Sequence, residues 1–219
     1  MLNIKHSILQ RLKLKVCGMR DAQNILEVAS CIQPHYMGFI FYEKSKRYVG
    51  ESFSEEVLSA VSASIKKTGV FVNAPYEYIV NKINRYTLDA VQLHGEEAPD
   101  LCARLKANGT EIIKVFLLDK DFSFSELEPY EKHCDYYLFD TKTKDYGGSG
   151  TSFDWEILKK YKSEKPFFLS GGIDTDCAEK LKTLSSLPLY AIDVNSKFET
   201  SPGMKNVEKL KHLVTLLNA

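Results

Sequence analysis

The sequence predicts an α/β protein, a single (β/α)8 TIM barrel spanning residues 1–219, in which residues 1–11 form a lead-in segment. Short and mostly continuous apolar runs recur eight times, as in strands buried on both faces of a parallel sheet. Apolar residues at helical spacing lie between these runs. Eight units in 219 residues give about 27 residues per unit, close to the pitch of this barrel. The expected strands span 12–17, 36–42, 69–73, 90–94, 112–118, 136–140, 166–170 and 190–194.

Helix start signals support eight helices alternating with these strands. Ser54, Asp154 and Asp174 each precede a stretch of helical character, and side chains of this kind cap helix N-termini. Apolar stripes at 22–29, 57–65 and 207–217 fit the same pattern. A doubly wound open sheet also alternates strands and helices, but no GxGxxG motif follows the first strand, which favours the barrel.

The composition excludes several classes of protein. The chain has 29 basic and 29 acidic residues, so it lacks the concentrated positive charge that nucleic-acid binding requires. No apolar run approaches the roughly 18 residues that span a bilayer. Five cysteines without CxxC spacing argue against a disulfide framework or a zinc site and predict a cytoplasmic protein. The first 20 residues are basic and contain no acid, but their short apolar centre favours a lead-in over a targeting segment.

Polar residues follow the C-terminal ends of the predicted strands, where barrel enzymes carry their active sites. The candidates at these ends are Cys17, Arg47, His94, Asp140 and Asp193. The N-terminal strand ends carry only scattered charges, and this asymmetry indicates an enzyme. Four of them also have a structural alternative: a small core cysteine for Cys17, a surface arginine for Arg47, a structural histidine for His94 and a loop-capping aspartate for Asp140.

Three segments predict a site for a phosphorylated small molecule. Gly147-Gly148-Ser149-Gly150 follows the sixth predicted strand, Gly171-Gly172 the seventh, and Asn195-Ser196 the eighth. Glycines let backbone amides approach a dianion closely, and loops after strands seven and eight are the common phosphate site of this fold. No HxH or HExxH spacing, Walker A motif or GxSxG elbow is present, so no metal site is predicted.

Ordered motifs along most of the chain resemble those of the phosphoribosylanthranilate isomerase family of tryptophan biosynthesis. The segments that carry the resemblance are 15–20, 38–42, 45–49, 69–73, 91–95, 139–142, 146–150, 153–155, 169–172 and 193–196, followed by Glu199, 201–203 and Lys205. The resemblance implies an Amadori rearrangement of N-(5-phosphoribosyl)anthranilate to the 1-deoxyribulose 5-phosphate ketone. It also implies no cofactor and no metal, and a monomer or a homodimer.

The resemblance also assigns expected roles. Cys17 falls on the family's general base and Asp140 on its general acid, while Arg47 matches the arginine that holds the anthranilate carboxylate. Backbone amides around Gly148, Ser149, Gly172 and Asn195-Ser196 would bind the phosphate.

Two pKa shifts are expected from this chemistry. An aspartate at its ordinary pKa is only about 0.1% protonated at pH 7, so the pKa of Asp140 should be raised. The pKa of the Cys17 thiol should be depressed, and strand alternation puts Lys15 on the same face as a source of positive charge.

Two residues depart from the family pattern. Lys46 stands where the family often has proline, and Lys197 stands where it has glycine, which could add positive charge near the phosphate. A relative of indole-glycerol-phosphate synthase is the first alternative, but no catalytic lysine with glutamates at strand ends can be singled out. A catalytically inactive barrel that only binds a phosphosugar or a protein is the second, and the presence of both Cys17 and Asp140 argues against it.

Overall fold

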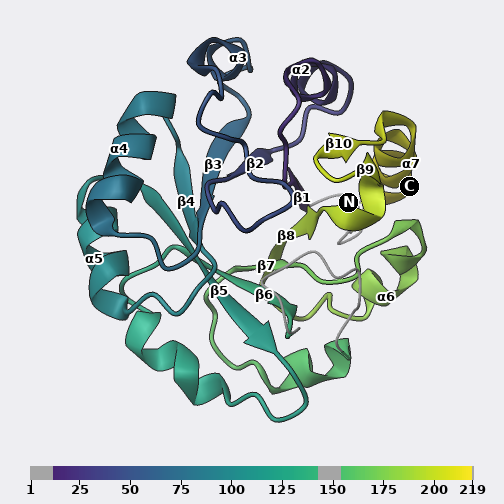
Figure 1. Cartoon of the computed structure of the whole chain (residues 1–219). Helices are drawn as coiled ribbons and strands as arrows, with labels where there is room; N and C mark the ends of the chain where they lie inside the picture. Colours follow the sequence, from purple (N-terminus) through teal and green to yellow (C-terminus); the bar gives the residue numbers. More distant parts are fainter. Residues whose placement is uncertain (1–11, 143–153, 219) are drawn as a thin grey trace, which may run out of the picture.

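Eight parallel strands close into a barrel in chain order, with β1 pairing with both β2 and β8 (Figure 1). The computed structural model describes residues 12–142 and 154–218. The strands are β1 (Lys13–Val16), β2 (Tyr36–Ile40), β3 (Lys66–Phe71), β4 (Ala90–Leu93), β5 (Glu111–Leu118), β6 (Tyr136–Thr141), β7 (Phe167–Leu169) and β8 (Leu189–Val194). The predicted fold class is confirmed, and the open-sheet alternative is wrong. The expected lead-in of residues 1–11 lies outside the described residues.

The helical segments surround the barrel, one after each strand (Figure 1). They are α2 (Ala22–Cys31), α3 (Glu55–Ser59), α4 (Tyr76–Tyr86), α5 (Pro99–Ala107), η1 (Phe124–Tyr130), η2 (Trp155–Lys160), η3 (Thr175–Cys177) with α6 (Ala178–Lys182), and α7 (Val207–Asn218). The expected N-caps Ser54, Asp154 and Asp174 each accept a backbone N–H. After β5 and β6 the expected α-helices are 3-10 helices instead, and in η1 the ring of Pro129 removes one backbone donor.

Several strands end before the expected apolar runs do, which leaves the last residues of those runs at the mouth of the barrel. Cys17, Asn73 and His94 lie just beyond the last paired residues, so their side chains are at the rim. β3 begins at Lys66, before its apolar run, because Lys66 pairs with Tyr36 of β2. An unexpected hairpin of β9 (Glu199–Ser201) and β10 (Met204–Lys205) follows the short helix η4 (Ser196–Phe198).

Alternation along β6 shows how the sequence divides the core. Tyr137 and Phe139 belong to the large cluster between barrel and helices, while Leu138 packs in a separate cluster with Phe168, and Tyr136 packs against it. Burying an aromatic side chain such as Phe139 contributes about 1.5–3 kcal/mol relative to exposure. Successive strand residues point to opposite faces, so Asp140 shares the interior face of the barrel. In the two described ranges, no helix is long and apolar enough to cross a membrane.

Candidate active site

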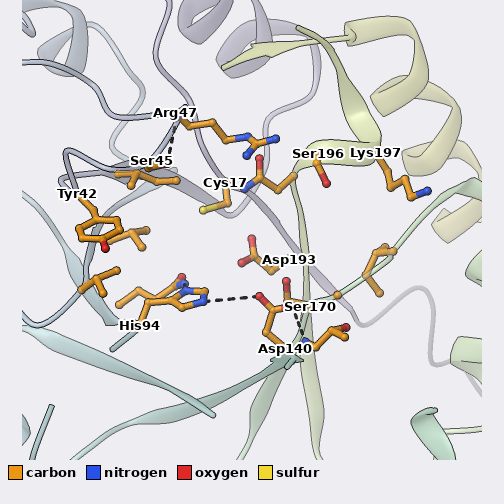
Figure 2. A pocket seen from close by; sticks show the side chains of 18 of the residues that line it. Cys17, Tyr42, Ser45, Arg47, His94, Asp140, Ser170, Asp193, Ser196 and Lys197 are labelled. Carbon is orange, nitrogen blue, oxygen red and sulfur yellow. Dashed lines mark hydrogen bonds and ion pairs between the residues drawn. The ribbon is translucent and has the colours of Figure 1, made fainter. Parts of the chain in front are cut away.

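A cavity of about 820 Å³, open space at its mouth included, lies at the C-terminal end of the barrel. Figure 2 shows the side chains of Cys17, His94, Asp140 and Asp193 surrounding one space. The predicted site residues that line it are Cys17, Arg47, His94, Asp140, Gly171, Gly172, Asp193, Asn195 and Ser196. Gly148 and Ser149 lie outside the described residues. The structure therefore brings together nine candidates that are far apart in the sequence.

Cys17 follows β1 and lies in a buried, charged corner of the cavity. Its backbone N–H donates to the Val194 carbonyl at 2.9 Å, which holds the residue against the end of β8. Room for the thiol comes from Gly38 of β2, because a Cβ at that position would lie 2.7 Å from Sγ. Lys15, fully buried two residues earlier, forms an ion pair of 2.9 Å with Oδ2 of Asp193.

The pKa of Cys17 is raised, so the expectation of a depressed thiol pKa is wrong for this structure. Burial is the largest cause, and the nearby Asp193 carboxylate adds to it. Lys15 does face the thiol as predicted, and Lys15 and Lys205 both oppose the rise. The Lys15 ammonium is shared with Asp193, and its positive charge does not overcome the desolvation of a thiolate.

Burial raises the pKa of Asp140 to about 6, with a smaller rise from Asp193. The Thr141 amide, which donates to Oδ1 at 2.7 Å, opposes this shift, as do Lys15 and Ser170. The expected direction is confirmed. A carboxyl with a pKa near 6 is protonated about a tenth of the time at pH 7, roughly a hundredfold more often than an ordinary aspartate.

His94 and Gln92 form the β4 side of the cavity. Nε2 of Gln92 lies 3.0 Å from Nδ1 of His94, and Nε2 of His94 lies 3.7 Å from Oδ2 of Asp140. Burial, followed by the positive charges of Lys114 and Lys15, lowers the pKa of His94 to about 3. The imidazole is therefore neutral at physiological pH.

Arg47 is held by the carboxylate of Glu199, a residue to which the sequence analysis assigns no role. Its Nε and Nη2 donate to both oxygens of Glu199, at 2.6–3.0 Å. Lys205 donates to the same carboxylate at 2.6 Å and to Oδ1 of Asn195 at 2.8 Å. Burial opposes ionisation of Glu199, but Arg47 and Lys205 together hold its pKa below the usual value. Glu199 and Lys205 both belong to the segments that carry the family resemblance, and the sequence offers no other indication that they are part of the site.

The loop after β7, which also lines the cavity, has the backbone geometry expected of an anion site. Gly171 and Gly172 have φ of 85° and 69°, a conformation that favours glycine. A Cβ at Gly171 would lie 2.3 Å from Oγ1 of Thr141, so this loop requires glycine on steric grounds as well. Asn195, Ser196 and the exposed Lys197 line the same cavity, and Lys205 links the Asn195 side chain to Glu199.

Within residues 12–142 and 154–218, no cluster of three or more histidine, cysteine or acidic side chains could hold a metal ion. Fold and site together define the class of protein: a (β/α)8 barrel with a polar cavity at the C-terminal ends of its strands. The family model for N-(5'-phosphoribosyl)anthranilate (PRA) isomerase matches residues 14–216. The chain belongs to this family.

Relatives of the same name are similar over almost the whole chain. An N-(5'-phosphoribosyl)anthranilate isomerase from Parabacteroides distasonis is 46% identical over 202 residues, which cover 92% of this chain and 91% of the relative. The crystal structure of the Thermotoga maritima enzyme is 30% identical, with a TM-score of 0.80, and covers 94% of this chain and 98% of that one. A phosphoribosyl anthranilate isomerase in complex with reduced 1-(o-carboxyphenylamino)-1-deoxyribulose 5-phosphate is 26% identical, with a TM-score of 0.77 and the same coverage.

Proposed function

We propose that this enzyme converts N-(5-phosphoribosyl)anthranilate into 1-(2-carboxyphenylamino)-1-deoxy-D-ribulose 5-phosphate, an Amadori rearrangement in tryptophan biosynthesis, by general acid–base catalysis. The observation that carries the proposal is that Cys17 and Asp140, 123 positions apart in the sequence, line one cavity with Arg47 and a glycine-bordered anion site. The structural relative that holds a reduced form of this product supports the choice of substrate.

Asp140 acts first, as the general acid. Its proton goes to the ring oxygen of the ribose, the C1–O bond breaks, and the nitrogen lone pair forms a C1 iminium. The raised pKa of Asp140 supplies the protonated carboxyl that this step needs at neutral pH. Burial, the main cause of that shift, also makes the resulting carboxylate a poor resting state, so the proton is readily recovered in the next turnover.

Cys17 acts second, as the general base. It removes the C2 proton, the C–H electrons form the C1=C2 bond, and the iminium electrons return to nitrogen. The enolamine then tautomerises to the C2 ketone. Because burial raises the thiol pKa, the base needs added positive charge, and the iminium provides it at the carbon next to the reacting one. Lys15 stabilises the same thiolate from the protein side.

Binding groups at both ends keep the substrate over these two residues. Arg47, held in place by Glu199, faces the cavity and binds the anthranilate carboxylate. Gly171, Gly172 and Asn195-Ser196, which line the same cavity, take the phosphate. The resemblance adds Gly148 and Ser149 to the phosphate ligands and gives His94 and Asp193 places at the rim.

Single substitutions of the two catalytic residues test this function. Cys17→Ala and Asp140→Asn should each lower kcat by about 100-fold or more, as the loss of a general base or acid does. The loss of anthranilate-type fluorescence on mixing follows turnover, and rescue of a tryptophan auxotroph that lacks this step provides a check in cells. Cys31→Ala, which removes an exposed thiol, is the matched control. Near-normal turnover in either variant would contradict the assignment, and binding without turnover by the parent would favour an inactive binding barrel.

We further propose that the enzyme works in the cytoplasm, as a monomer or a homodimer, and without nucleic acid. The family's biosynthetic role supports the location, and equal numbers of basic and acidic residues support the last point. A Thermotoga maritima relative, described as a dimeric enzyme from which monomers were generated, shows that both states occur among similar structures. Sedimentation of the purified chain distinguishes the two states.

A further inference from the structure

Three side chains form a line across the barrel mouth from β4 to β6. Gln92, almost fully buried, contacts Nδ1 of His94 at 3.0 Å. The other ring nitrogen, Nε2, is buried, has no hydrogen-bond partner among the described residues, and faces Oδ2 of Asp140 at 3.7 Å (Figure 2). A buried polar nitrogen without a partner is costly, and its position beside the proposed acid calls for an explanation.

The contact with Gln92 determines which ring nitrogen carries the proton. The amide nitrogen of Gln92 can only donate, so Nδ1 of His94 must accept. The imidazole is neutral because its pKa is lowered to about 3 by burial and by Lys114 and Lys15. A neutral ring has one proton, which is therefore on Nε2 and directed at Asp140.

The hydrogen bonds of Asp140 determine which of its oxygens loses a proton. Oδ1 accepts the Thr141 amide at 2.7 Å, as a carbonyl oxygen does, so the acidic proton of the neutral form is on Oδ2. While that proton is present, Nε2–H of His94 faces another O–H group and stays beyond hydrogen-bond distance. Once the proton leaves, Oδ2 becomes an anionic acceptor, and a small rotation of either side chain closes the gap.

We propose that His94 is a positioning residue for Asp140, whose Nε2–H binds Oδ2 when that oxygen gives its proton to the substrate, and that Gln92 fixes the ring tautomer this requires. The histidine keeps its own proton throughout, so within this pair only Asp140 gives up a proton. The interaction is stronger after transfer than before it, which is the kind of contact that accelerates a reaction. This inference rests on the proposed role of Asp140 as general acid.

Other groups also face this pair, and Ser170 among them is a hydrogen-bond donor to Asp140. Asp193 of β8 raises the pKa of Asp140, whereas Lys15 of β1 and Ser170 after β7 lower it. Lys114 of β5 donates to the Leu93 and Gly95 carbonyls and to Glu97, and affects the ring of His94 only through its charge. Ser170 already bonds the carboxyl in the resting enzyme, so His94 is the donor that is added when Oδ2 loses its proton.

Two substitutions of His94 test whether the side chain acts as a hydrogen-bond donor or only fills space. In His94→Gln the side-chain amide reaches the place of Nε2–H, whereas in His94→Asn it is too short to do so. Full-length enzyme labelled with 13C at aspartate carboxyls reports the pKa of Asp140 by NMR, with Asp140→Asn identifying the signal. We expect His94→Asn to raise that pKa by about one unit, because the anion loses its donor. We expect His94→Gln to leave it near the parent value.

Kinetics provide the second measurement. His94→Asn should lower kcat about tenfold with little change in KM, and it should move the alkaline limb of kcat/KM to higher pH. His94→Gln should restore most of kcat. If His94→Asn does not fold, Gln92→Leu tests the same point with the imidazole in place, and a smaller rise in the pKa of Asp140 is expected because the tautomer is no longer fixed.

Three results would overturn the proposal. They are an unchanged pKa of Asp140 in His94→Asn, a raised KM with kcat and the alkaline limb unmoved, and a His94→Gln variant as impaired as His94→Asn. The NMR measurement uses the resting enzyme and needs no turnover. Failure of the proposed function would instead appear as activity retained by Asp140→Asn, whatever the carboxyl pKa does.

Discussion

The two ends of the barrel interior are built from the same strands but have different chemistry. At the N-terminal end, Tyr136 and Tyr190 stack with ring centroids 4.6 Å apart, and Phe168 meets both Tyr136 and Tyr36 edge-on. At the C-terminal end, the interior holds the Lys15–Asp193 ion pair next to ionisable groups of the cavity. The N-terminal end is filled by packed aromatic side chains, and the C-terminal end contains a cluster of charged side chains.

The difference extends to how well the buried polar atoms are satisfied. At the base the Tyr36 hydroxyl contacts that of Tyr190 at 3.4 Å, and Oε2 of Glu111 pairs with Lys66, while Oε1 of Glu111 is buried without a partner among the described residues. At the mouth, Oε1 of Gln92, Nε2 of His94 and Oδ1 of Asp193 are buried without a partner among the described residues. Polar atoms left unpaired cost stability, and the three at the mouth line one cavity, where they are available to a substrate.

The sharpest test of this contrast is Asp140→Asn, which should have opposite effects on activity and stability. Turnover should fall about 100- to 10,000-fold. The pKa of Asp140 is about 6 in the fold against an ordinary 3.8, so the folded protein holds the proton more tightly than the unfolded chain. This tighter proton binding adds to the free energy of unfolding. The added stability is fully present below about pH 3.8 and is lost as the pH rises through about 6.

Above pH 6 the parent therefore contains a costly buried carboxylate that the asparagine lacks. We expect Asp140→Asn to unfold with a free energy about 3 kcal/mol higher than the parent at pH 8, and with an equal one below pH 4. Urea unfolding at the two pH values measures this. Equal free energies of unfolding for the variant and the parent at pH 8 would show that the buried Asp140 carboxylate does not destabilise the fold.

Tyr36→Ala should do the reverse at the base of the barrel. Tyr36 is almost fully buried and packs against Phe168 and Tyr190, so its truncation should cost about 3–5 kcal/mol of unfolding free energy. The kcat of the folded enzyme should stay within about twofold. Tyr36→Phe is the matched control and should cost about 1 kcal/mol, because it removes only a hydroxyl contact. A large fall in kcat at unchanged stability would mean that the two ends are coupled.

Glu199→Gln should change binding at the mouth more than it changes chemistry. Without its charge, Glu199 no longer fixes Arg47, and the positive charges of Arg47 and Lys205 are left facing each other. We expect KM to rise about tenfold and kcat to change less. Steady-state kinetics measure both constants. The control is Glu208→Gln, which removes the charge of an exposed acid on α7. An unchanged KM would mean that Arg47 does not depend on this clamp.

The smallest expected effect is that of Lys197→Gly, which restores the residue common in the family. Lys197 is exposed at the rim, so its charge is screened by salt. Competitive inhibition by inorganic phosphate should weaken about two- to threefold at low ionic strength and hardly at all at high salt. Lys162→Gly, in a loop at the other end of the barrel, should change neither value. No change for Lys197→Gly at low salt would make this lysine a bystander.

The fold and most of the cavity could be predicted because both follow from local patterns. Apolar runs marked the eight strands, and the residues that ended them, such as Cys17 and Asp140, lie at the rim. The direction of the Cys17 pKa could not be predicted, since it depends on how burial compares with a lysine whose charge Asp193 shares. The Arg47–Glu199 pair also escaped prediction, because it depends on a hairpin that joins residues 152 positions apart.

The buried bond between Lys15 and Asp193 joins side chains 178 positions apart, across the seam where the first strand meets the last. During synthesis Lys15 leaves the ribosome long before its partner carboxylate exists. The surroundings of the Cys17 thiol are therefore complete only when β8 pairs with β1 and closes the barrel. Catalytic competence in this chain should appear in one step with the final strand, so that half-made barrels have no partial activity.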